Sequence, residues 1–179
     1  MKSRILILNL ILTAFFIDFA NAQEEETLSE AIDRISFHWD TEALVLETYD
    51  GLTKFCKDTE YRTSIIDLMN EIHHYDSVLY QKAKIAQTRS SDHEIDKLIK
   101  DLESIEGKYS FKNFIHFLKI ECDGQKALEK NSLDLKTAMG EESFDGQKYV
   151  IEVEMQRYVK HLTKKVDLVR KHVHHLHIK

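Results

Sequence analysis

The sequence predicts an all-α fold, and three observations support this prediction. The chain of 179 residues has no proline and only five glycines, although β folds use both residues in their many turns. Apolar residues recur at intervals of three and four over long stretches, which places them on one face of a helix. No convincing stretch alternates apolar and polar residues in the way that predicts a half-buried strand.

The first 22 residues have the organisation of a secretory signal peptide. Met1–Arg4 is basic, Ile5–Phe19 is mostly apolar, and Ala20-Asn21-Ala22 has the small-x-small pattern of a cleavage site. The apolar run is short for a transmembrane helix. We therefore expect cleavage after Ala22, a single mature domain of residues 23–179 without a membrane anchor, and a periplasmic or secreted location.

Four amphipathic stretches follow the signal segment. Helices are expected at about residues 27–55, 58–87, 93–122 and 146–175, with a kink or interruption of the third at Gly107–Ser110. A polar stretch at about 131–145 is the longest connection, and the other loops are short. Four helices of comparable length joined in this way pack most economically as an antiparallel up-down-up-down four-helix bundle, here with a long C-terminal helix.

Cys56 and Cys122 are the only cysteines. In the predicted topology, Cys56 lies at the turn between the first two helices, and the end of the third helix brings Cys122 back to the same end of the bundle. We favour a disulfide, which an extracytoplasmic compartment permits. The alternative is a pair of buried thiols that pack as small apolar groups. Neither interpretation indicates redox catalysis, because the chain has no Cys-x-x-Cys motif.

Glu42, Glu71 and His74 form the first candidate metal site. Ferritin-like bundles bind metal through glutamates and Glu-x-x-His motifs on facing helices, and Glu71 and His74 have that spacing. Glu42 is in step with the apolar stripe of the first helix and is expected at a similar height. However, the chain has no second Glu-x-x-His, and helical geometry places His74 on the polar side of its helix. The alternative is a solvated Glu71 and His74, with Glu42 paired to a basic side chain.

The carboxyl end is the second candidate metal site. His172, His174, His175 and His177 offer imidazoles that bind divalent ions, and two pairs of them are spaced three residues apart on a continued helix. A tight zinc site needs three or four oriented ligands. The alternatives are a weak surface metal site and a set of protonated histidines that complements the negative end of the helix dipole.

Aromatic residues provide a third candidate, a site for a small apolar ligand between the helices. Trp39, Tyr75, Phe114 and Phe117 would line such a cavity. The same residues are better explained as core filling. His116 belongs to the polar stripe of its helix and is expected to face water, whereas His161 is expected to pack beside the core.

The net charge of −6 argues against nucleic acid and anionic membranes as partners, because both require a basic surface. The chain lacks a Gly-x-Ser-x-Gly elbow, a glycine-rich phosphate loop and a His-Glu-x-x-His motif, so we assign no catalytic residue. The leading hypothesis is a non-catalytic module that binds another protein or a second copy of itself, with Val173 and Leu176 of the last helix at the dimer surface. The alternatives are a bundle that binds a divalent metal as its cofactor and a carrier of a small apolar ligand.

Overall fold

The computed structural model describes residues 26–105, 107–129 and 140–175. In these residues it contains six α-helices and one 3₁₀ turn, with no strand. The elements are α2 (Leu28–Leu46), α3 (Tyr49–Lys57), α4 (Thr59–Gln87), α5 (His93–Ile105), α6 (Phe111–Glu129), α8 (Glu141–Lys171) and the 3₁₀ turn η1 (Val173–His175). The all-α prediction is confirmed.

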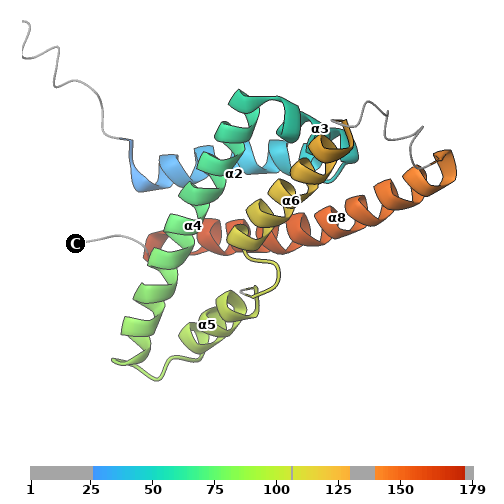
Figure 1. Cartoon of the computed structure of the whole chain (residues 1–179). Helices are drawn as coiled ribbons and strands as arrows, with labels where there is room; N and C mark the ends of the chain where they lie inside the picture. The colour runs from blue at the N-terminus through green and yellow to red at the C-terminus, as the bar shows by residue number, and fades with distance from the viewer. Residues whose placement is uncertain (1–25, 106, 130–139, 176–179) are drawn as a thin grey trace, which may run out of the picture.

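Two long helices, α2 and α8, lie side by side and antiparallel (Figure 1). The indole Nε1 of Trp39 donates a hydrogen bond to Thr163 Oγ1 at 3.0 Å. Ten residues further along the chain, at the start of α3, the backbone N–H of Tyr49 donates to Glu152 Oε1 of α8 at 2.9 Å. In Figure 1, α4 and α6 cross in front of these helices, and α5 packs against α4 and α8. The predicted bundle of four comparable helices is not confirmed, because α3 and α5 are separate short helices.

The buried apolar side chains form two clusters. The larger cluster joins α2, α3, α4, α6 and α8 around Trp39, Phe55 and Phe114. The smaller cluster joins Leu79 of α4 to residues of α2, α5 and α8. Each fully buried apolar side chain stabilises the fold by about 1.5–3 kcal/mol, so the stripes visible in the sequence supply most of the driving force for helix packing.

The prediction of one helix over residues 27–55 is wrong, because the chain turns between α2 and α3. Thr48 adopts an extended backbone, and its Oγ1 accepts a hydrogen bond from the N–H of Gly51 at 3.0 Å, which caps α3. A Cβ on residue 51 would lie 1.9 Å from the carbonyl oxygen of Val45. The turn therefore requires glycine at this position.

The predicted interruption of the third helix is confirmed. Helices α5 and α6 are separate, and Gly107 has a φ of 98°, a left-handed conformation that glycine adopts at low cost. The side-chain amide of Asn113 donates a hydrogen bond to the carbonyl oxygen of Gly107 at 2.7 Å. This contact ties the connection to the first turn of α6.

The last helix begins earlier and ends earlier than predicted. Residues 141–145, which were expected in the polar connection, form the first turn of α8, where Glu141 and Glu142 complement the helix dipole. Helix α8 ends at Lys171 and a 3₁₀ turn follows, so the chain does not continue as one helix to His175. The remainder of the predicted connection, residues 131–139, lies outside the described residues.

The predicted disulfide is confirmed. Cys56 of α3 is bonded to Cys122 of α6, and their Cα atoms are 5.1 Å apart. The short helix α3, which the sequence did not predict as a separate element, carries Cys56 to the C-terminal half of α6. The bond joins residues 66 positions apart in the sequence.

Within the described residues, no helix combines the length and apolar character needed to cross a bilayer. The predicted signal segment, residues 1–22, lies outside the described part of the chain.

Candidate functional site

A buried ion pair joins α4 to α8. The ammonium Nζ of Lys165 lies 2.7 Å from the carboxylate Oδ2 of Asp76. Lys165 is 1% exposed and Asp76 is 4% exposed. Both residues lie within the apolar faces of their helices, Asp76 between Ile72 and Leu79 and Lys165 beside Val166.

Such a pair is weak evidence for stability. Removing two charges from water costs several kcal/mol per ion, and their mutual attraction often fails to repay this cost. A buried titratable group in the wall of a cavity is instead a physical indication of a functional site. Asp76 and the groups around it are therefore candidates for a functional site.

A cavity of about 410 Å³ opens beside this pair, between α4 and α5. We call it the α4–α5 cavity. It is lined by Asp76, Ser77, Tyr80, Gln81, Leu102 and Glu103. Its volume falls within the range of sites that bind small molecules. Five of its six lining residues carry polar groups, although apolar atoms make up the larger part of its exposed surface.

Glu103 forms the outer part of the α4–α5 cavity. Its Oε1 accepts a hydrogen bond from the phenol of Tyr80 at 2.9 Å and lies 3.0 Å from Nζ of Lys84. The contact with Lys84, followed by that with Tyr80, lowers the pKa of Glu103 below its ordinary value. The cavity therefore presents two carboxylates, each already held by a lysine.

Asp76 and Lys165 were not predicted from the sequence as site residues. The signal that could have found them is a charged residue in step with an apolar stripe. Asp76 lies four residues after Ile72 and three before Leu79, and Lys165 lies three after Leu162 and four before Val169. Two opposite charges so placed on different helices indicate a buried pair.

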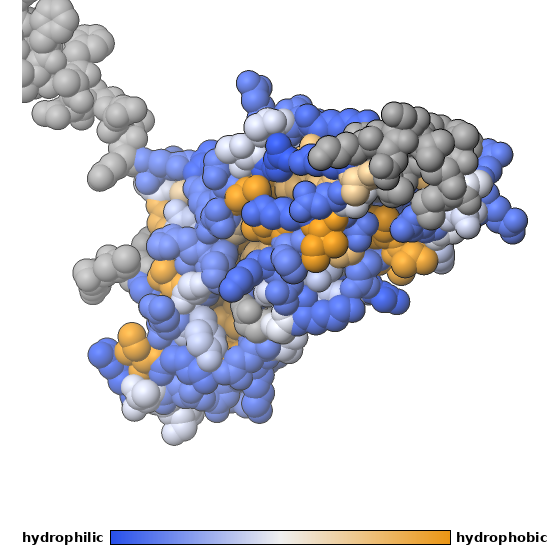
Figure 2. Space-filling view, viewed as in Figure 1, coloured by the Kyte–Doolittle hydropathy of each residue, from blue (hydrophilic) through white to orange (hydrophobic). Residues whose placement is uncertain are grey.

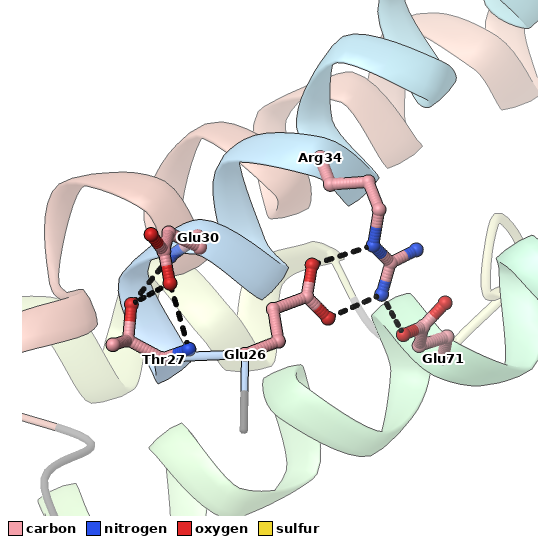
Figure 3. A network of polar contacts seen from close by, with 5 residues as sticks. All are labelled: Glu26, Thr27, Glu30, Arg34 and Glu71. Atoms are coloured by element: carbon pink, nitrogen blue, oxygen red, sulfur yellow. Dashed lines mark hydrogen bonds and ion pairs between the residues drawn. The ribbon is translucent and has the colours of Figure 1, made fainter. Parts of the chain in front are cut away.

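The structure does not bring Glu42, Glu71 and His74 together as a metal site. Oε1 of Glu71 accepts a hydrogen bond from Arg34 at 2.9 Å, and Arg34 also binds Glu26 (Figure 3). Oε2 of Glu42 accepts from the phenol of Tyr61 at 2.7 Å. His74 is exposed, as its place on the polar side of α4 predicts.

No group of three potential metal ligands lies together in the described parts of the chain. At the carboxyl end, the rings of His172 and His174 have centroids 6.2 Å apart. Because α8 ends at Lys171, the helical spacing that predicted shared ions does not extend over these residues. The side chain of His175 and the whole of His177 lie outside the described residues.

The four aromatic residues proposed to line a carrier cavity pack in or beside the core. Trp39 and Phe114 are fully buried. The ring of Phe114 stacks on Tyr158 with a centroid distance of 4.9 Å, and Phe117 meets the same ring at 5.5 Å. Tyr75 packs against both apolar clusters.

The two remaining histidine predictions agree with the structure. His116 is exposed on α6. His161 stacks on Tyr109 with a centroid distance of 4.4 Å, and its Nδ1 lies 2.7 Å from the carbonyl oxygen of Arg157. His161 therefore has a packing role at the edge of the core.

Several large apolar side chains remain exposed. Figure 2 shows a largely hydrophilic face with apolar patches over α6 and α8. On α2, Phe37 is 76% exposed and Leu44 is 71% exposed. The other exposed large apolar residues of the described chain are Ile85, Ile120, Tyr149 and Val150.

Glu154 of α8 provides a test of acid stability. Its carboxylate lies 2.7 Å from Lys108 Nζ and 3.1 Å from Arg157 Nη1. The hydrogen bond from Lys108, with a smaller effect of Arg157, lowers the pKa of Glu154 below its ordinary value of 4.5. This stabilisation is therefore complete above the pKa of the unfolded state and is lost as the pH falls through the lower, folded-state pKa.

We expect Glu154→Gln to lower the thermal midpoint at pH 7, and we expect this effect to shrink as the pH falls through the lowered pKa of Glu154. Thermal melts from pH 2.5 to 7 measure this difference. Glu47→Gln, at the turn between α2 and α3, serves as the control. A destabilisation of Glu154→Gln that is equal at all pH values would contradict the assignment.

No family model matches the sequence, and comparisons with curated proteins and with solved structures likewise find no match. Function is therefore inferred from the geometry.

Proposed function

We propose that this protein is a non-catalytic binding module that works outside the cytoplasm and recognises a protein partner through the outer face of α2. The observation that carries the proposal is the exposure of Phe37 and Leu44, 76% and 71% respectively. A single exposed apolar residue needs no explanation, but two of them on one face of a helix offer a partner paired anchor points.

Phe37 and Leu44 lie on the same face of α2. They are seven residues apart, or two helical turns, which separates their Cα atoms by about 10.5 Å along the axis. The opposite face carries the buried residues Ile32, Ile35 and Trp39. Anchors with this spacing are typical of helices that dock against an apolar surface of a partner.

The charges around this face favour a basic partner. Glu30, Asp33 and Asp40 are exposed on α2, and the chain has a net charge of −6. Asp40 lies 3.6 Å from Arg170, and Arg34 is the one exposed lysine or arginine of α2, so acidic residues are in excess on this helix. Two copies of this face would place like charges opposite each other, whereas a partner with lysine or arginine around an apolar centre would be attracted. The proposal therefore names a basic protein surface as the occupant.

The extracytoplasmic location has two supports. The Cys56–Cys122 disulfide is of the kind that persists in oxidising compartments. The sequence of residues 1–22 has the pattern of a secretory signal.

The metal-binding and apolar-carrier alternatives have less support. Glu42 and Glu71 are held by Tyr61 and Arg34, and the aromatics proposed for the carrier cavity pack in or beside the core. The proposed dimer surface on the last helix has less support too, because Val173 lies in η1, after the end of α8, and packs against the smaller apolar cluster. Leu176 lies outside the described residues.

Cross-linking tests the proposal. A p-benzoylphenylalanine at position 37 is expected to capture a protein with a basic contact surface from the native extracytoplasmic fraction, and the same group at position 120 is not. We then expect Phe37→Ser/Leu44→Ser to weaken binding of the purified partner at least tenfold. Binding should also weaken as the salt concentration rises.

Ile85→Ser/Ile120→Ser is the matched control, because both residues are 53% exposed on other helices. Equal loss of binding in this control would contradict the assignment to α2. Capture of a second copy of the chain alone, or binding independent of salt, would also overturn the proposed basic partner.

A further inference from the structure

We propose that the α4–α5 cavity binds a small, neutral, polyhydroxylated molecule of monosaccharide size. This site is separate from the outer face of α2, so its test is independent of the proposed protein-binding function. The inference rests on the charge balance of the cavity, its hydrogen-bonding groups and its shape.

The balance of charges in the wall of the α4–α5 cavity disfavours a charged ligand. An anion would face the carboxylates of Asp76 and Glu103, both in the cavity wall. A cation would meet carboxylates that Lys165 and Lys84 already neutralise, at 2.7 Å and 3.0 Å. Because each carboxylate has its own ammonium, the site has no net charge with which to select an ion.

The hydrogen-bonding groups favour hydroxyls. Ionised carboxylates only accept hydrogen bonds, whereas the Gln81 amide and the Ser77 and Tyr80 hydroxyls both donate and accept. A ligand hydroxyl also donates and accepts, so several hydroxyls on one small ring can meet this mixed lining. The Glu103 carboxylate, whose pKa is lowered, can make the stronger, charge-assisted hydrogen bonds of an ionised acceptor.

The shape of the cavity suits a compact molecule. Asp76 and Leu102 are buried, 4% and 2% exposed, and form the inner wall. Leu102 offers an apolar surface to the C–H groups of a sugar ring, while Gln81 and Glu103 are exposed at the outside. A volume of about 410 Å³ suits a small ligand rather than a chain segment.

The test is saturation-transfer NMR on the disulfide-bonded protein with D-glucose, D-galactose, D-mannose and myo-inositol as separate probes. At least one probe is expected to receive saturation, while putrescine and succinate, a dication and a dianion, do not. Ser77→Phe places a ring in the cavity and should weaken binding of that probe at least tenfold. Gln81→Ala removes an exposed amide with little effect on folding and should weaken it at least threefold.

His74→Phe is the matched control, because His74 is exposed on α4 outside the cavity lining. Binding in this variant should equal that of the unaltered protein. The proposal is overturned if none of the four neutral probes binds, or if His74→Phe weakens binding as much as Ser77→Phe. It is also overturned if Ser77→Phe and Gln81→Ala leave binding unchanged, or if putrescine or succinate binds and Ser77→Phe abolishes that binding.

Discussion

Breaking the buried ion pair on one side is expected to destabilise the protein by about 3–5 kcal/mol. In Lys165→Met, the Asp76 carboxylate stays in a site where it is only 4% exposed, but it loses the ammonium 2.7 Å away. The cost of burying the charge then exceeds the attraction that balanced it. Urea unfolding at pH 7, followed by circular dichroism, measures the effect.

The double variant Asp76→Leu/Lys165→Met separates the loss of charge balance from the loss of packing. Because it removes both charges, it should recover most of the stability lost in Lys165→Met. Arg170→Met is the control for surface pairs, since the half-exposed Arg170 lies 3.6 Å from Asp40 and 2.6 Å from Asp167, both also about half exposed. We expect a loss of less than about 1 kcal/mol there. A loss in Lys165→Met no larger than in this control would contradict the burial of the pair.

Loss of the disulfide is expected to lower the free energy of unfolding by about 4 kcal/mol. The bond joins positions 66 residues apart, and cross-linking so long a loop restricts the unfolded chain, in the chain-entropy account of disulfide stability. The variant Cys56→Ala/Cys122→Ala, compared with the oxidised protein by urea unfolding, measures this effect.

Reduction of the unaltered protein with dithiothreitol provides the control. It should destabilise the native chain by a similar amount and leave the double alanine variant unchanged. A reductant effect of equal size on both proteins would show that the destabilisation does not arise from the Cys56–Cys122 bond.

The local patterns in the sequence predicted the helices more accurately than their boundaries. The stripe through Ile65, Leu68 and Ile72 placed α4 within one or two residues of its observed bounds. The stripe through Leu28 to Tyr49, in contrast, continued across the turn at Thr48, because periodicity records which face is apolar and not whether the axis changes direction. Gly51 is the residue in the sequence that indicates this turn. Its close contact with the Val45 carbonyl, which only the tertiary structure shows, explains why glycine is required there.

The candidate sites depended more strongly on tertiary structure. Glu42 and Glu71 looked like paired ligands because their heights on two helices were similar, but each carboxylate binds another side chain, Tyr61 and Arg34 respectively. No sequence motif marks the α4–α5 cavity, because its residues come from two helices and no local pattern specifies the angle between them.

The sequence by itself determined the all-α class and the helical faces that are buried, because these follow from side-chain spacing and the absence of proline. It also singled out the two cysteines that form the disulfide. Tertiary structure alone decided where the helices break, how α4 and α6 cross α2 and α8, and that Asp76 meets Lys165 in the interior. The physical reason is that propensity and amphipathic pattern act over a few turns, whereas crossing angles, ion pairs and cavities arise from the mutual packing of residues far apart in the chain.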